Sequence, residues 1–169
     1  MIAFLRFVGL SNAALWFGAT VFFTFAVGPS FFSEPMLKLL GRPHAGAAAQ
    51  LVLERYFLLH QVCATTALLH LVAEALYLGR IIHRWTLGLL LGLLLVGLFA
   101  GYGIQPRLQT LHKIMHLPTS EEEQKTAAAS SFRLWHGLSM TLNLVVLGGV
   151  WVYLVRVTRI PDTSRYRFS

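Results

Sequence analysis

The sequence predicts an all-α integral membrane protein, folded as an antiparallel bundle of four membrane-spanning helices. The 169 residues are 56% hydrophobic and only 12% charged, whereas about 25% of residues are charged in an average soluble domain. The apolar residues gather in four stretches, each of which reaches the ~20 residues that a helix needs to cross a hydrocarbon core. These stretches are residues 5–27, 56–78, 85–104 and 134–155. Unpaired backbone groups are costly in lipid, so each stretch should be helical.

The first connection contains a helix stop, a helix start and a break. Span 1 ends at Gly28-Pro29-Ser30, a helix-stopping sequence. Ser33 then caps a short interfacial helix through residue 40, which the sequence Gly41-Arg42-Pro43 breaks. From residue 45 to 78 the chain is rich in alanine and has no helix breaker, so one long helix should lead into and through span 2.

The second long connection is predicted to hold another interfacial helix. A tight basic turn at residues 79–84 leads into span 3. After Pro106, apolar residues recur at 108, 111, 114, 115 and 117, which is typical of an amphipathic helix on the membrane surface. A new helix should begin at residues 119–123 and run into span 4. Residues 1–157 therefore form one transmembrane domain, followed by a basic tail at residues 158–169.

The chain is strongly basic, with a formal net charge of +7. In a membrane protein this charge favours anionic lipid headgroups over nucleic acid as the partner, and the chain has no RNA-binding sequence pattern. Basic residues near the span ends are equally numerous on the two sides, but they cluster most tightly in the short turn and the tails. That clustering predicts cytoplasmic termini. The lone cysteine, Cys63, excludes an intrachain disulfide.

Polar residues share helix faces within the spans. On spans 2 and 4 these residues lie three or four positions apart, so they share one face of each helix. Two residues of span 1 have the same four-residue spacing. Ionisable groups in a membrane usually face the bundle interior. Span 3 instead has two glycine pairs at GxxxG spacing, which predict close helix packing or oligomer contacts. The residues concerned are His60, Cys63, His70 and Glu74; Arg133, His136, Ser139, Met140 and Asn143; Asn12 and Trp16; Gly88, Gly92, Gly97 and Gly101.

The candidate site lies at the end of the bundle that carries the long connections. Spans 2 and 4 both begin there, so their first histidines fall in one leaflet with arginines just outside. The second connection adds an arginine and two histidines. We expect Arg55, His60, Arg107, Arg133 and His136 to gather at this end, beside His112 and His116.

Four interpretations of this cluster are open. Histidines on two helices can hold a haem b, and His60 with His136 is such a pair. Histidines four residues apart can clamp a divalent metal if a third ligand is present, which singles out His112 and His116. Arg55, Arg107 and Arg133 suit an anionic lipid or organic anion. The fourth interpretation is a hydrogen-bonded plug that only closes the bundle.

Several motifs, in order along nearly the whole chain, resemble the transmembrane-protein-205-like family, a bacterial domain of unknown function. The resemblance implies a four-span helical fold and marks Trp16, Arg107, Arg133, His136, Ser139 and Asn143 as motif positions. The motifs are residues 15–20 (LWFGAT), 56–57 (YF), 106–107 (PR), 132–139 (FRLWHGLS) and 143–144 (NL).

Span 1 is also similar, more weakly, to the copper-resistance-D and haem-containing protoporphyrinogen-oxidase membrane groups. The similarity rests on a pattern of Trp, Gly and Phe that ends in Gly-Pro. Span 1 has no histidine here, which departs from the haem group, and the methionines form no ladder for copper.

We therefore expect a small non-enzymatic membrane protein that binds a ligand, lipid or partner subunit at the long-connection end, with no catalytic residue assigned. The alternative is a haem-b or metal-binding, oxidase-like redox protein. The ligand-binding candidates are Arg55, His60, Arg107, Arg133, His136, Ser139, Asn143 and Trp16, and the metal candidates are His112 and His116.

Overall fold

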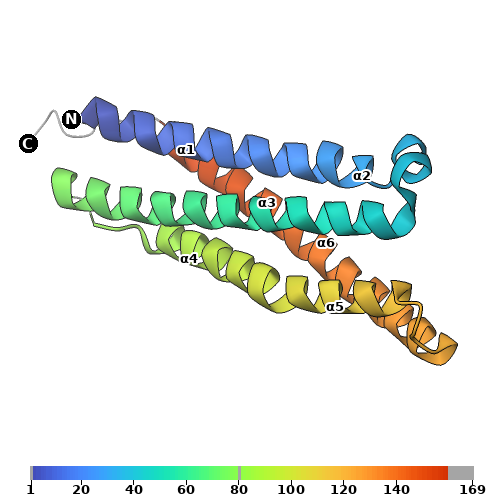
Figure 1. Cartoon of the computed structure of the whole chain (residues 1–169). Coiled ribbons are helices and arrows are strands. Elements are labelled where there is room, and N and C mark those ends of the chain that lie inside the picture. The colour runs from blue at the N-terminus through green and yellow to red at the C-terminus, as the bar shows by residue number, and fades with distance from the viewer. Residues whose placement is uncertain (1, 80, 160–169) are drawn as a thin grey trace, which may run out of the picture.

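The computed structural model describes residues 2–79 and 81–159, and this part of the chain is helical with short connections (Figure 1). The predicted tail lies outside the described residues from position 160 onward. In chain order the elements are α1 (Ile2–Phe22), the π-helical turn η1 (Phe23–Val27), α2 (Gly28–Ser30), α3 (Glu34–Leu78), α4 (Arg84–Leu98), the π-helical turn η2 (Phe99–Ile104), α5 (Gln105–His116) and α6 (Glu122–Thr158).

The predicted fold class is confirmed. Within the described residues, four helices are long and apolar enough to cross a membrane. They are Ala3–Ser30, Glu34–Tyr77, Arg84–His116 and Glu122–Thr158. The start of α1, the turn between α3 and α4, and the end of α6 lie at one end of the bundle, and the two long connections lie at the other (Figure 1).

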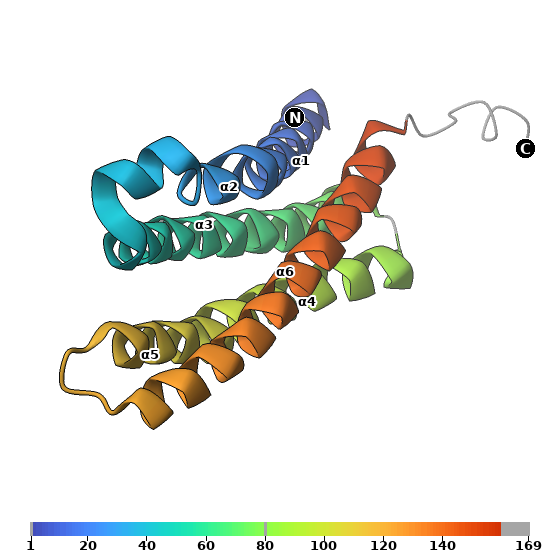
Figure 2. The same ribbon diagram turned by 90° about the vertical axis from the view of Figure 1, so that its right-hand side faces the viewer.

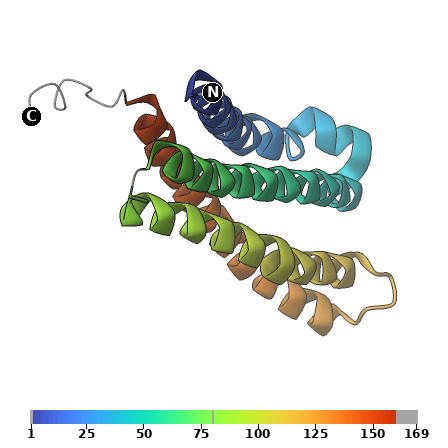
Figure 3. The same ribbon diagram turned by 90° about the vertical axis from the view of Figure 1, so that its left-hand side faces the viewer.

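The helices do not form a regular square bundle. α1 and α3 run side by side, and α4 lies on the other side of α3 (Figure 3). α6 crosses the other helices obliquely, packing on α5 near its own start and on α1 near its end (Figure 2). The first half of α6 therefore diverges from α1 and α2 towards the long connections.

Two prolines explain where the spanning helices widen. The backbone N–H of Gly28 donates to the carbonyl of Phe23, and that of Gln105 donates to the carbonyl of Ala100, so each bond reaches five residues back. A proline, Pro29 or Pro106, follows directly in each case. Because proline has no N–H and its ring clashes with the carbonyl four residues earlier, an ordinary α-helical turn is disfavoured there. A π-helical turn accommodates the proline without ending the helix.

The second connection helix therefore differs from the expectation. α5 is present over the predicted segment, but it continues the third span through Pro106. The resulting helix Arg84–His116 has 33 residues, which is roughly 50 Å at 1.5 Å per residue and exceeds a hydrocarbon core of about 30 Å. In the first connection, the predicted break at Gly41 is confirmed, since its φ of 69° interrupts α3.

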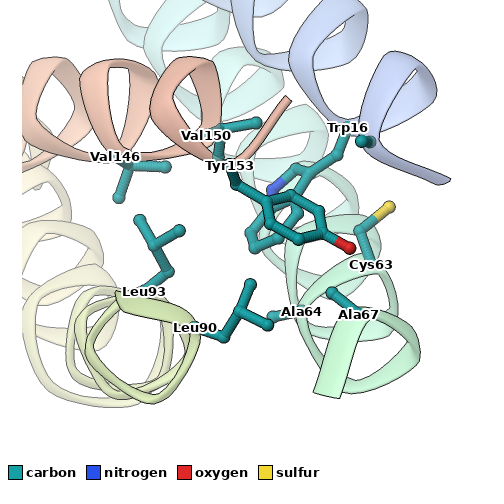
Figure 4. Close-up of a cluster of buried hydrophobic side chains, with 10 residues drawn as sticks. Trp16, Cys63, Ala64, Ala67, Leu90, Leu93, Val146, Val150 and Tyr153 are labelled. Atoms are coloured by element: carbon teal, nitrogen blue, oxygen red, sulfur yellow. The ribbon is translucent and has the colours of Figure 1, made fainter. Parts of the chain in front are cut away.

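Buried residues from α1, α3, α4 and α6 form the core (Figure 4). Two aromatic rings, those of Trp16 and Tyr153, lie 6.1 Å apart at its centre. Small residues on α3, Ala64 and Ala67, are fully buried beside them. The remaining members are Ala13, Cys63, Leu90, Leu93, Val146 and Val150. Small side chains on α3 thus make room for large rings from its neighbours.

Two histidines of α3 dock over glycines of the adjacent helices. Nε2 of His60 donates to the carbonyl of Leu93 at 2.9 Å, and the ring occupies the space that a side chain at Gly97 would need. Nε2 of His70 donates to the carbonyl of Leu5 at 2.7 Å, and its ring lies in the same way over Gly9. In both cases the glycine lies four residues after the accepting carbonyl, so α3 is joined to α4 and α1 by the same arrangement.

The two glycine pairs of span 3 therefore have different environments. Gly97 meets His60, and a Cβ at Gly101 would lie 3.5 Å from atoms of Phe57 and Gln61. Neither Gly88 nor Gly92 would meet another atom within 4 Å. The second pair thus packs within this chain on α3, and the first pair faces outward.

We predict that Gly97→Ala destabilises the protein, because the new methyl group would overlap the His60 ring. Overpacking of this kind costs about 1–3 kcal/mol, so the thermal midpoint in detergent should fall. Gly92→Ala is the matched control, since its Cβ meets no atom and alanine is favoured over glycine in a helix by roughly 1 kcal/mol. In a His60→Ala background the Gly97→Ala penalty should shrink. Equal effects of Gly97→Ala and Gly92→Ala would contradict the proposed docking.

Candidate functional site

His60 is held at the bundle centre by hydrogen bonds to two other helices. The indole N–H of Trp16 can only donate, and it donates to Nδ1 of His60 at 3.1 Å. Nδ1 is therefore unprotonated, and Nε2 carries the hydrogen that is donated to the carbonyl of Leu93. The His60 side chain is only 2% exposed. The geometry thus assigns a neutral imidazole in which neither nitrogen is left for a ligand.

A second set of hydrogen bonds joins α3, α6 and η1. The Tyr56 hydroxyl donates to Oδ1 of Asn143 at 3.0 Å, and Nδ2 of Asn143 donates to the Thr24 hydroxyl at 2.7 Å. Thr24 in turn donates to the carbonyl of Thr20. The Tyr56 ring stacks on Phe23, with centroids 4.3 Å apart. One amide side chain on α6 thereby holds both neighbouring helices.

We call these six residues, Trp16, Thr20, Thr24, Tyr56, His60 and Asn143, the polar layer. Thr20 is fully buried, and its hydroxyl donates to the carbonyl of Trp16. Buried polar groups are costly unless they are paired. Because the members of the layer satisfy one another, the geometry of this part of the site supports the plug interpretation.

The predicted site residues fall into separate groups. Trp16, His60 and Asn143 belong to the polar layer, whereas Arg55, Arg107, Arg133 and His136 lie on exposed positions outside it and Ser139 is half-buried. At 100° per residue, Arg55 lies on roughly the opposite side of α3 from Gln50, whose carbonyl receives a hydrogen bond from Gln105 at the end of the third helix. The guanidinium of Arg107 lies over the Trp135 ring at 4.8 Å. The structure therefore does not bring the three arginines to one point.

His60 and His136 are also not brought together. Tyr56 and Asn143 mark a common level, because their side chains are hydrogen-bonded. From that level His60 lies four residues towards the end where α3 stops, and His136 lies seven residues towards the long connections. The separation along the helices is about 16 Å, too far for both rings to bind one iron atom.

Three histidines instead join a row of rings between α5 and α6. The centroids of His116 and His112 are 4.4 Å apart, those of His112 and Phe132 are 6.3 Å apart, and those of Phe132 and His136 are 5.7 Å apart. The His112 ring also covers Gly46 of α3. Within the described residues, no group of three or more His, Cys, Asp or Glu side chains is placed to hold a metal ion. The predicted metal pair thus has no third such ligand in that part of the chain.

The inner face of α6 changes character halfway along the helix. Val150, Val146, Asn143, Ser139 and His136 follow one another at steps of four and three residues, so they share one face. Val150 and Val146 are buried in the core, whereas His136 is exposed. The change occurs where α6 diverges from α1 (Figure 2). Beside this face Arg133 and Met140 are exposed, and Ser139 is half-buried. We call Arg133, His136, Ser139 and Met140 the α6 stripe.

The three arginines near this end, Arg55, Arg107 and Arg133, are not neutralised by carboxylates of the described residues. Glu34 pairs with Lys38, Glu122 pairs with Lys125, and Glu54 accepts a hydrogen bond from Gln109. In residues 2–79 and 81–159, neither Arg55, Arg107 nor Arg133 makes an ion pair. Arg133 is therefore an exposed, uncompensated cation directly beside His136.

A shallow apolar hollow lies where α1 and α2 meet the start of α3. Five of its six lining residues are apolar, and the sixth is a serine, so it offers little polar chemistry. The lining residues are Phe22, Ala26, Val27, Ser30, Phe31 and Met36.

A family model described as a domain of unknown function, DUF4149, matches residues 12–117. The chain belongs to the DUF4149 family. The match begins in α1 and ends just after α5, so in this DUF4149 chain it includes Trp16, His60 and Arg107, whereas α6 lies outside it. No curated protein and no solved structure matches the chain.

Sequence reasoning missed several residues that shape the site. Thr20 and Thr24 follow Trp16 at four-residue steps, a pattern that could have placed them on the same inner face of this DUF4149 protein. Tyr56 was expected as the start of span 2 and as part of a family motif, but not as a partner of Asn143, with which it forms a hydrogen bond across the bundle. The contacts of Gly9 and Gly97 with histidines depend on the register between helices, which cannot be predicted from the sequence around each residue.

Two buried tyrosines provide a matched test of the polar layer. We predict that Tyr56→Phe lowers the thermal midpoint, because it leaves Oδ1 of Asn143 without its donor, at a cost of about 1–3 kcal/mol. Tyr153→Phe should leave the midpoint unchanged or raise it. The Tyr153 hydroxyl is buried and makes no hydrogen bond among the described residues. Thermal melts of both variants in one detergent measure the difference, and a greater loss in Tyr153→Phe would contradict the hydrogen bonding described above.

Proposed function

We propose that this DUF4149 protein is a small, non-enzymatic membrane protein that binds an anionic ligand, either a lipid or a charged group of a partner, at the long-connection end. The observation that carries the proposal is the α6 stripe. There Arg133 is exposed without an ion-pair partner, beside the exposed ring of His136.

Electrostatics favour an anion at this position. A guanidinium near a membrane boundary loses part of its hydration, and a phosphate or carboxylate restores strong, often bidentate, hydrogen bonds. His136 and the half-buried hydroxyl of Ser139 add donors on the same helix face. Arg107 and Arg55 lie at the same end and raise the local positive potential without sharing the site.

The alternative proposal is a haem-b or metal-binding redox protein. The observation that favours it is the ring row of His112, His116 and His136. His60 supports it less, because both ring nitrogens are already hydrogen-bonded. An absorption spectrum with metal analysis of the purified protein separates the two proposals. A Soret band or bound metal that is lost in His112→Ala or His136→Ala would favour the redox protein.

Three further proposals concern family, topology and assembly. Within DUF4149, the motif around residues 132–139 supports a relationship to the transmembrane-protein-205-like proteins, and the weaker likeness of span 1 supports a distant one to the copper-resistance-D and protoporphyrinogen-oxidase groups.

The basic short turn supports cytoplasmic termini. If copies of the chain associate, the outward Gly88 and Gly92 are the glycines that remain open for contact.

We predict that phosphatidylglycerol stabilises the purified protein more than phosphatidylcholine does. Each lipid is titrated into detergent micelles, and the thermal midpoint is measured. The additional rise in the thermal midpoint with phosphatidylglycerol should disappear in Arg133→Gln, because the uncompensated guanidinium is removed. Arg84→Gln is the matched control, since it removes an exposed arginine from the opposite end of the bundle. Equal stabilisation by the two lipids, or an excess that survives Arg133→Gln, would refute an anion site on α6.

A further inference from the structure

The α6 stripe lies at membrane depth, which restricts what can reach it. His136, Ser139 and Met140 all fall within the apolar stretch 134–155 that is predicted to cross the bilayer. The Met140 side chain is 57% exposed. A molecule that contacts Met140 must therefore enter from the hydrocarbon region and cannot come from water alone.

The order of side chains along the stripe follows the polarity of one lipid leaflet. Arg133 comes first, at headgroup depth, and His136 and Ser139 follow as neutral polar groups. Met140 and Leu144 are then exposed and apolar, about two and about three helical turns beyond Arg133. A phospholipid shows the same order of phosphate, ester region and acyl chain.

The polar layer marks the inner limit of this surface. Asn143 is occupied by its bonds to Tyr56 and Thr24, so its amide is not available to a ligand. Below it, Val146 and Val150 are buried against the other helices. The stripe therefore ends next to Asn143, while the outer face of α6 stays exposed beyond it at Leu144 and Trp151. The length on α6 from Arg133 to Asn143 is about 15 Å, close to one leaflet of a 30 Å core.

Resting on the proposed anion site, we propose that the α6 stripe binds one anionic phospholipid from the bilayer. Its phosphate contacts the Arg133 guanidinium and the His136 ring, and one acyl chain lies along Met140 where α6 diverges from α1. The charge complementarity rests on Arg133, which makes no ion pair among the described residues.

A fluorescent reporter on the stripe tests this assignment. Met140→Trp is introduced together with Trp85→Phe, Trp135→Phe and Trp151→Phe, while Trp16, which is 1% exposed, stays as a shielded background. The protein is placed in phosphatidylcholine nanodiscs that contain a minor fraction of dibrominated phosphatidylglycerol or of dibrominated phosphatidylcholine. One guanidinium–headgroup contact should enrich the anionic lipid beside the reporter by about fivefold, which is measured as stronger quenching.

Two controls define the site. The excess quenching should vanish in Arg133→Gln and persist in Arg84→Gln. A second reporter protein, which keeps Trp151 in place of the Met140→Trp substitution, should be quenched equally by the two lipids, because Trp151 is exposed on α6 at the depth of the other leaflet.

The outcomes separate this inference from the function on which it rests. Equal quenching by the two brominated lipids at the Met140→Trp reporter overturns the lateral phospholipid site. If phosphatidylglycerol still stabilises the protein through Arg133 in micelles, the anion site survives and only its occupant changes. Inorganic phosphate that reverses the quenching would assign the site to a soluble anion. If neither the excess quenching nor the Arg133-dependent stabilisation by phosphatidylglycerol is seen, the proposed function is overturned as well.

Discussion

The arrangement of the helices depends on one buried side chain, the imidazole of His60. It accepts a hydrogen bond from Trp16 on α1 and donates one to the backbone of Leu93 on α4. A single residue of α3 thus sets the distance of this helix from both α1 and α4. The approach is close enough that only glycine fits at position 97. In lipid, apolar contacts alone give helices little reason to prefer one register. The contact of His60 requires one tautomer of its ring, the carbonyl of Leu93 and a glycine at position 97. It therefore favours a single register between the helices.

The position of this contact explains why the two ends of the molecule differ. At the end where α1 begins and α6 ends, α6 packs into a core that Trp16 and Tyr153 fill (Figure 4). Towards the long connections, the last hydrogen bonds that α6 makes to other elements among the described residues are those of Asn143 to Thr24 of η1 and Tyr56 of α3. Beyond them, α1 and α6 diverge and the inner face of α6 is exposed. Groups that stabilise the bundle and groups that are free to bind are thus separated along one helix.

The sequence was sufficient for the fold because long apolar stretches leave few alternatives in a bilayer, and the Gly41 break followed from local chemistry. It was less sufficient for the site. Residue counts along the spans placed His60 and His136 close together in one leaflet, whereas the hydrogen bond between Tyr56 and Asn143 sets them about 16 Å apart along the helices. Counting residues along a span gives the depth of a side chain but not the side of the helix on which it lies. Arg55 was therefore expected beside the other arginines, although it lies on the far side of α3. The third span was expected over residues 85–104 with a separate surface helix after Pro106, yet η2 joins the two into one helix.

The tautomer of His60 is the most direct test of this account. Nitrogen NMR of the protein labelled with ¹⁵N-histidine, with the His60 signals identified by their loss in His60→Gln, reports which ring nitrogen carries hydrogen. We predict a neutral ring, protonated at Nε2, whose Nδ1 accepts a hydrogen bond that is lost in Trp16→Phe. A ring protonated at Nδ1, a doubly protonated ring, or a nitrogen bound to a metal or haem iron would contradict it. Any of these results would return His60 to the set of candidate ligands.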